Sequence, residues 1–277
     1  FEKERIPKYV NLFDYDNLEN NEFIVSRQPV YLSADKQIRA DVMLYVNGIP
    51  LVIIECKNPV SFSANWFEGY RQVKEYEKAV PELFKYVQLG IAAEQIAKYF
   101  PIVPWQEEVR AYEWREEEKD SIDSTVEMLS PEILLDIVKN FLFFRVEMGN
   151  ATKVVARYMQ YRAANKIVER VLNHLEGKEE KNRGLIWHWQ GSGKTLTMIF
   201  AANKLYRARE LENPTIFFIV DRIELEEQLY TEFAALDMPP ELIGSVEELR
   251  KVIRHDEWRG KRGMMLTLIH KFRYEEM

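Results

Sequence analysis

Two carboxylates and a lysine stand around a short apolar run in the first quarter of the chain. Glu55 and Lys57 follow residues 51–54, and Asp41 precedes them. Residues two apart on a strand share a face, so Glu55 and Lys57 would point the same way. Phosphodiester cleavage needs a divalent metal, and two carboxylates with the carbonyl of Cys56 are oxygen ligands suited to Mg²⁺. Lys57 would stabilise the charge that develops on the phosphate or position the attacking water.

A helix predicted over residues 66–78 supplies two more polar groups. Gln72 and Tyr76 are four residues apart, so they lie on one face of that helix and are expected beside Glu55 and Lys57. A Glu-x-Lys triplet alone is also typical of an ordinary surface strand. Asp41 upstream and Gln72 with Tyr76 downstream favour the catalytic interpretation.

A glycine-rich segment in the second half has the composition of a phosphate loop. Residues 188–195 read His-Trp-Gln-Gly-Ser-Gly-Lys-Thr between a predicted strand and a predicted helix. Gly191, Ser192 and Gly193 would turn backbone N–H groups toward phosphate oxygens. Lys194 would reach the β- and γ-phosphates of ATP, and the Thr195 hydroxyl would hold Mg²⁺. The alternative is a glycine-rich turn with an incidental Lys-Thr pair, and His188 stands where the usual pattern has glycine.

The length of the chain favours two domains, and we expect two α/β domains over residues 1–145 and 146–277, the second beginning with a linking helix that ends at the polar connector 177–182. The first is expected to mix strands and helices, and the second to have a parallel sheet covered on both faces. In the first domain we expect strands at 23–25, 30–32, 42–46, 51–54 and 87–92, and a further helix opening at Ser130-Pro131. In the second we expect helices at 152–175, 195–208 and 225–235, and strands at 184–188, 215–220 and 264–269.

Composition limits the classes of partner. The chain has 277 residues, one cysteine and a net charge of −7. It shows no apolar run of the roughly 18 residues that a membrane span needs, and the single cysteine fits the reducing cytoplasm. Nucleic acid would have to bind through local basic patches, first of all near Lys57, Arg71 and Lys74.

The predicted helix 152–175 carries a basic side. Such a stripe is either a solvated face or a set of contacts to DNA phosphates, and both interpretations stay open. Its residues are Lys153, Arg157, Arg162, Lys166 and Arg170.

The metal-site hypothesis can be tested on geometry, because Asp41 and Glu55 must point to the same face of the hairpin that connects them. A regular two-residue turn at Asn47-Gly48 pairs Asp41 with Ile54 and sends Glu55 to the opposite face. A shared metal therefore requires an odd loop or a bulge. We expect a three-residue loop over residues 46–48 with Gly48 at positive φ.

Several of these segments together resemble one family. Residues 39–42 and 46–59 are similar to the nuclease domain of the R (HsdR) subunit of type I restriction enzymes, and Gln72-x-x-x-Tyr76 resembles the accessory motif of the RecB-like nucleases. Residues 187–198 resemble helicase motif I, residues 220–228 motif Ia, and residues 267–272 the next motif. Residues 157–161 resemble the adenine-reading glutamine region, which makes Gln160 an expected base contact.

The resemblance implies a PD-(D/E)xK nuclease domain followed by part of a RecA-like motor domain with a P-loop. The implied activity is Mg²⁺-dependent cleavage of double-stranded DNA coupled to ATP-driven translocation, in a cytoplasmic complex with methyltransferase and specificity subunits. No Asp-Glu-x-His motif is found up to Met277, so only the front of the motor is expected. Alternatives are a type III restriction or repair helicase-nuclease, a DNA-dependent ATPase that grips DNA without cutting it, and an α/β nucleotide-binding protein with an unrelated front domain.

Overall fold

The computed structural model describes residues 10–34, 36–59, 65–147, 149–258 and 260–272. The chain forms two compact units, one ending at Lys139 and the other beginning at Asn140. The sequence boundary after residue 145 falls within a strand of the second unit. That strand belongs there because Phe143 stacks on Phe200 and Arg145 pairs with Glu232 at 3.1 Å.

The first unit is built on a mixed five-stranded sheet with the order β1-β4-β5-β6-β7. β5 and β6 run parallel, and the other neighbouring strands are antiparallel. The strands are β1 (Phe23–Arg27), β4 (Val42–Val46), β5 (Ile49–Cys56), β6 (Leu89–Ala93) and β7 (Ala97–Pro101). A separate hairpin pairs β2 (Val30–Ser33) with β3 (Lys36–Arg39). The strands expected from the sequence are confirmed, whereas β3 and β7 are additional.

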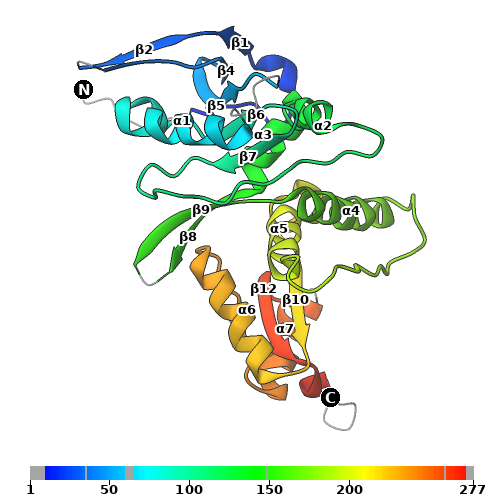
Figure 1. The fold of residues 1–277 in the computed structure, drawn as a ribbon. Helices are drawn as coiled ribbons and strands as arrows, with labels where there is room; N and C mark the ends of the chain where they lie inside the picture. The colour runs from blue at the N-terminus through cyan, green and yellow to red at the C-terminus, as the bar shows by residue number, and fades with distance from the viewer. Residues whose placement is uncertain (1–9, 35, 60–64, 148, 259, 273–277) are drawn as a thin grey trace, which may run out of the picture. The chain divides into compact units, whose positions relative to one another are not determined.

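The α-helices that accompany this sheet in the described residues are α1 (Trp66–Ala79), α2 (Ser121–Met128) and α3 (Pro131–Asn140) (Figure 1). Helix α1 starts where the Asn65 side chain accepts a hydrogen bond from the Phe67 N–H, which caps the helix. Its buried face carries Tyr70 and Val73, and the Tyr70 ring meets Phe100 edge-on at 4.8 Å. The predicted helix over 66–78 is thus confirmed, and it lies over β5 and β6.

The β4–β5 connection decides where the two carboxylates point. Val46 pairs with Ile49, so Asn47 and Gly48 form a two-residue turn, with φ of 51° and 77°. The expected three-residue loop is therefore wrong. The register instead shifts farther along the hairpin, where Tyr45 pairs with Pro50 but Leu44 pairs with Val52, and Leu51 is the extra residue. This bulge restores the odd offset that a shared face requires.

The second unit opens with a hairpin, and the end of its second strand lies where the sequence predicts helix. β8 (Leu142–Glu147) pairs with β9 (Asn150–Val155), and α4 (Tyr158–Leu175) begins only after them. The helix expected from residue 152 is wrong over its first residues. The β-branched Thr152, Val154 and Val155 fit a strand as well as an amphipathic helix, and pairing with β8 decides between the two.

The sheet of the second unit is parallel, as predicted. It has the order β10-β12-β11, with β10 (Thr215–Val220), β11 (Glu241–Leu242) and β12 (Gly263–Leu268). The accompanying helices are α5 (Lys194–Arg207), α6 (Ile223–Ala235) and α7 (Val246–Trp258). Phe218, Phe233 and Leu266 form the centre of its core.

The strand predicted over residues 184–188 is not formed. This segment has no strand pairing in the described part of the chain, and Leu185 and Trp187 are 90% and 84% exposed. Its apolar residues match a strand of a parallel sheet, but a strand exists only where a neighbouring strand accepts its hydrogen bonds.

Replacement of Gly48 tests the turn. A Cβ at this position meets nothing within 4 Å, so the positive φ is the only obstacle to a side chain. We expect Gly48→Val to lower the free energy of unfolding by about 1–2 kcal/mol, and Gly48→Asn by much less, because Asn tolerates this region. Urea unfolding measures both, and equal losses would contradict the positive φ at Gly48.

Candidate functional site

Asp41 and Glu55 face each other across β4 and β5. Val42 pairs with Ile54, which puts Asp41 opposite Glu55, and the Asp41 N–H donates to Glu55 Oε1 at 3.3 Å. The Cys56 N–H donates to Asp41 Oδ2 at 2.9 Å. The two carboxylates therefore share one face, as the metal-site hypothesis requires.

The Glu55 carboxyl is held in an environment that disfavours its charge. Glu55 is 1% exposed. Burial, and secondly the charge of Asp41, raise the pKa of Glu55 to about 7, although the Asp41 N–H and the charge of Lys57 act in the opposite direction. An ionised Glu55 is thus undercompensated by the protein itself, a condition that a bound cation would relieve.

A chain of hydrogen bonds connects Lys57 to helix α1. Lys57 Nζ donates to Gln72 Oε1, and Gln72 Nε2 donates to the Tyr76 hydroxyl. The Tyr76 hydroxyl donates to the Arg39 carbonyl at 2.9 Å, and burial raises the pKa of Tyr76, which keeps that proton in place. The structure thus brings Lys57, Gln72 and Tyr76 together with the carboxylates, as the sequence predicts.

Gly69 is a site residue that the sequence analysis missed. A Cβ there would lie 3.2 Å from the Glu55 carbonyl and 3.3 Å from the Ala92 Cβ, so α1 approaches the strands at this point. The signal was available, because a glycine inside a helix is costly unless close packing needs it.

The donor set suits a hard cation. Asp41 and Glu55 offer carboxylate oxygens, and Cys56 contributes a backbone carbonyl at the same strand end, whereas its thiol is free and exposed. Among the described residues no group of three or more His, Cys, Asp or Glu side chains could hold a metal. A Mg²⁺ held here would therefore keep several water ligands.

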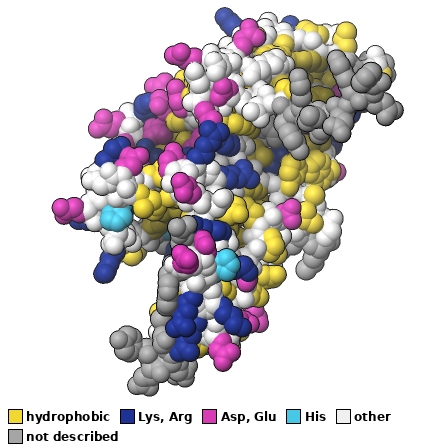
Figure 2. Space-filling view, turned by 180° about the vertical axis from the view of Figure 1, so that it is seen from behind, with side chains coloured by type: hydrophobic (Ala, Val, Ile, Leu, Met, Phe, Trp, Pro, Cys, Tyr) yellow, Lys and Arg dark blue, Asp and Glu magenta, His cyan; other side chains and the backbone are white. Residues whose placement is uncertain are grey.

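The basic residues expected beside this cluster differ in availability. Lys74 is 6% exposed and pairs with Glu77, so the prediction that it contacts DNA is wrong. Arg71 is exposed and lies 3.8 Å from Glu68. On the face shown in Figure 2 basic and acidic side chains are interspersed, in keeping with the net charge of −7.

The glycine-rich loop of the second unit leads into helix α5. Gly191 and Gly193 both have positive φ, 77° and 81°, and Gly193 is the residue that caps α5. Lys194 and Thr195 occupy the first two positions of the helix. Backbone N–H groups at such a terminus have no partner within the helix, so the geometry suits a phosphate group.

Two buried polar atoms of this loop have no partner within the described residues, His188 Nδ1 and Ser192 Oγ. Such atoms are costly unless a ligand or water satisfies them. Together with Gly191, Gly193, Lys194 and Thr195, they make residues 188–195 a chemically fitting site for ATP phosphates and Mg²⁺.

Gln160 lies behind the loop. It is 1% exposed, and its Nε2 donates to the carbonyls of Gly193 at 3.1 Å and Ser192 at 3.4 Å. Its Oε1 accepts from the Arg157 N–H at 2.9 Å. In this arrangement the Gln160 amide supports the glycine-rich loop, and a contact with adenine would require it to leave these partners.

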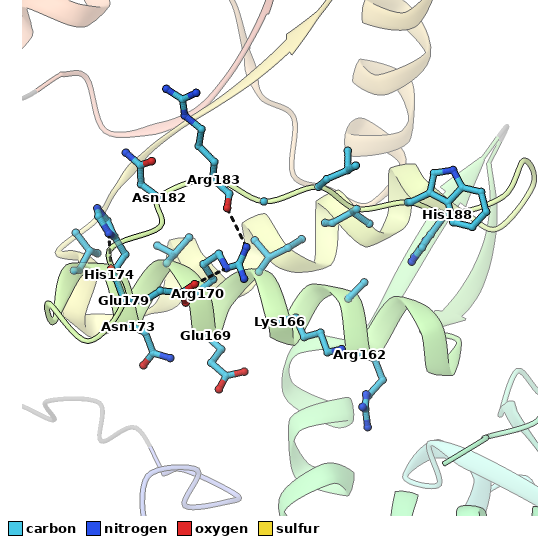
Figure 3. A pocket seen from close by; sticks show the side chains of 18 of the residues that line it. Arg162, Lys166, Glu169, Arg170, Asn173, His174, Glu179, Asn182, Arg183 and His188 are labelled. Atoms are coloured by element: carbon cyan, nitrogen blue, oxygen red, sulfur yellow. Dashed lines mark hydrogen bonds and ion pairs between the residues drawn. The ribbon is translucent and has the colours of Figure 1, made fainter. Parts of the chain in front are cut away.

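The segment before the loop lies along α4. Figure 3 shows Arg170 bonding to the Arg183 carbonyl and to the Glu179 carboxylate, at 2.9 and 3.3 Å, beside a groove of about 910 Å³. The basic side predicted for residues 152–175 is not one helix face, because Lys153 belongs to β9 and is buried.

Comparison with known proteins identifies the class of each half. Residues 1–109 match the family described as the type I restriction enzyme R protein N terminus, and residues 159–277 match the SWI2/SNF2 ATPase family. The chain thus combines a restriction-enzyme domain with an ATPase domain, in the order that the sequence motifs indicate.

Individual relatives agree. The chain is 37% identical to the MjaVIIIP endonuclease subunit of Methanocaldococcus jannaschii, over 98% of this chain and 28% of that protein. It is 31% identical to the type I restriction enzyme HindI endonuclease subunit of Haemophilus influenzae, over 96% of this chain and 26% of that protein. The chain belongs to the family of type I restriction enzyme R subunits, and it spans about a quarter of the length of these relatives.

The helices of the described residues include none with the length and apolar character needed to cross a bilayer.

The raised pKa of Glu55 predicts a pH-dependent stability. Between about pH 4.5 and 7 the folded protein keeps a proton that the unfolded chain has lost, so the free energy of unfolding falls as pH rises. Glu55→Gln lacks this effect. Relative to the wild type it should gain roughly 3 kcal/mol between about pH 5 and pH 8, at about 1.4 kcal/mol per pKa unit. Urea unfolding measures the difference.

Glu68→Gln is the matched control, because Glu68 is an exposed carboxylate on α1. Its stability should follow the wild-type pH profile. A Glu55→Gln profile parallel to that of the wild type would show that Glu55 ionises normally.

Replacing each of the two loop glycines by alanine tests whether Gln160 packs against the loop at Gly193. Both have positive φ, but a Cβ at Gly193 would lie 2.2 Å from Gln160 Nε2, whereas one at Gly191 meets nothing within 4 Å. We expect Gly191→Ala to cost about 1 kcal/mol of stability and Gly193→Ala at least twice that. Adding Gln160→Ala should recover part of the Gly193→Ala loss in thermal unfolding. Equal losses at the two glycines would argue against this support by Gln160.

Proposed function

We propose that the first unit is a PD-(D/E)xK nuclease that cleaves double-stranded DNA with Mg²⁺. The observation that supports it most is the shared face of Asp41 and Glu55, with Lys57 two residues farther along. Asp41, Glu55 and the Cys56 carbonyl would hold the ion. When bound, Mg²⁺ polarises the phosphate and acidifies a water molecule.

Each remaining group has a part in this proposal. Lys57 stabilises the negative charge that develops on the phosphate oxygens during attack. Gln72 and Tyr76 orient the Lys57 amine, because the hydrogen bonds from Lys57 through Gln72 to Tyr76 restrict its position. Ionised Asp41 and Glu55 repel DNA until a cation compensates them, which makes metal binding a condition for catalysis.

The proposal for the second unit is a P-loop ATPase that drives DNA translocation. Gly191, Ser192 and Gly193 would present backbone N–H groups to the phosphates, Lys194 would neutralise their charge, and Thr195 would hold Mg²⁺. Gln160 remains a proposed adenine contact. We further propose that a complete R subunit acts with methyltransferase and specificity subunits that select the DNA site.

Mg²⁺ binding can be measured without any activity. We expect Mg²⁺ to raise the thermal unfolding temperature of the wild type, and more at about pH 8 than at about pH 6, because the ion competes with the proton on Glu55. Asp41→Asn should remove most of the shift. A shift that is independent of pH and survives Asp41→Asn would place the ion elsewhere.

Cleavage separates the nuclease from a module that only grips DNA. In a complete R subunit carrying this sequence, assembled with its partner subunits, Asp41→Ala and Lys57→Ala should each reduce DNA breaks at least about 100-fold and leave ATP hydrolysis unchanged. Lys194→Ala is the reciprocal variant and should abolish ATP hydrolysis. Undiminished breaks in both nuclease variants would favour the gripping module.

A further inference from the structure

A row of paired residues crosses the sheet of the first unit. Glu55 in β5 pairs with Ala92 in β6, and Ala92 pairs with Lys98 in β7. Asp41 stands at the other end of the row, bonded to Glu55. Side chains directly opposite each other in neighbouring strands point to the same face, so Lys98 leaves the sheet on the face of the two carboxylates. Strands are about 4.8 Å apart, which puts the backbones of Glu55 and Lys98 roughly 10 Å apart.

On this face the Lys98 amine lies over an aromatic ring. Its Nζ lies 4.1 Å from the centroid of the Trp66 ring, at the start of helix α1. Trp66 packs against the core of the unit, which restricts the position of its ring and therefore of the Lys98 amine above it. Lys98 is partly exposed, and within the described residues no carboxylate forms an ion pair with it.

The residue in the middle of the row, Ala92, has a small side chain, and helix α1 packs directly against it. Helix α1 crosses Ala92 at Gly69, where an added Cβ would lie 3.3 Å from the Ala92 Cβ. This close approach brings the first turn of α1, and with it Trp66, near the sheet face that carries Glu55. The Lys98 amine is therefore placed by the same helix that orients Lys57 through Gln72.

We propose that Lys98 binds a backbone phosphate of the DNA that the nuclease site cleaves. The inference rests on the proposed nuclease function. Phosphates of one strand follow at about 3.4 Å along the duplex axis, so one within about three nucleotides of the cleaved bond falls near Lys98. Lys57 is engaged with Gln72 at the centre of the site, and Lys98 supplies a second, separate charge against the repulsion from Asp41 and Glu55.

The test is DNA affinity as a function of salt, with Lys98→Met as the variant. Methionine keeps the apolar stem over Trp66 and removes only the charge. Binding of a duplex of about 20 base pairs to the chain is followed by fluorescence anisotropy, with Ca²⁺ in place of Mg²⁺ to prevent cleavage. We expect Lys98→Met to bind about 3- to 10-fold more weakly at low salt, with a slope of log affinity against log salt shallower by about 0.9.

Lys85→Met is the matched control. Lys85 is an exposed lysine that precedes β6, whereas Ala92 lies near the end of that strand, so Lys85 is at the opposite end of the sheet. Its replacement makes the same change in net charge and should leave the affinity and the salt slope unchanged. Lys98→Arg should keep the wild-type salt slope, because it keeps the charge.

The outcomes separate the inference from the function on which it rests. Wild-type affinity and slope in Lys98→Met, with normal binding by the wild type, would overturn the inference and leave the nuclease proposal standing. An equal loss in Lys85→Met, or a lower melting temperature in Lys98→Met with an unchanged slope, would also overturn it. Absence of duplex binding by the wild type would overturn the inference, whereas the nuclease proposal is tested separately by the DNA breaks that the complete R subunit makes.

Discussion

One extra residue in β5 sets the geometry of the first unit. The turn at Asn47-Gly48 alone would send Asp41 and Glu55 to opposite faces, and the bulge at Leu51 brings them to one. Bulges bend a strand and redirect its side chains, and they occur often beside active sites. Pro50 stands next to the extra residue, at a point where a missing N–H disturbs the ladder least. The carboxylate pair depends on this local irregularity.

Burying Glu55 beside Asp41 raises the pKa of the Glu55 carboxyl. Its burial under α1 and its proximity to Asp41 raise its pKa to about 7, so the folded protein is less stable with this group ionised. Groups that destabilise the apo fold but suit a cation are expected where selection acts on function. Helix α1 ties the two properties together, since Gly69 allows the close approach and Gln72 holds Lys57.

In the second unit, too, polar groups are positioned by backbone geometry and by a contact from a helix that is distant in the sequence. The proposed phosphate loop of this unit turns sharply into α5, and two glycines at positive φ permit that backbone. Gln160, from a helix more than thirty residues earlier in the chain, supports the loop through the carbonyls of Ser192 and Gly193. Both units therefore position their polar groups by contacts between elements that are distant in sequence.

Local patterns determined much of this protein. Periodicity located β10 residue for residue and α1 to within one, because apolar spacing records which face of an element is buried. The types and spacing of Asp41, Glu55, Lys57 and the glycine-rich loop indicated the family, and the same residue types underlie the metal and phosphate ligation that we propose.

Tertiary structure decided what local patterns leave open. Residues 152–155 suit a strand or a helix, and pairing with β8 settled the choice. Residues 184–188 have the pattern of a strand, yet no neighbouring strand pairs with them in the described chain. Strand parity predicts that Asp41 and Glu55 share a face only if the hairpin has an odd offset, but it does not predict that Leu51 supplies that offset. Hydrogen-bond partners, register and bulges depend on residues far along the chain, so only the assembled sheet fixes them.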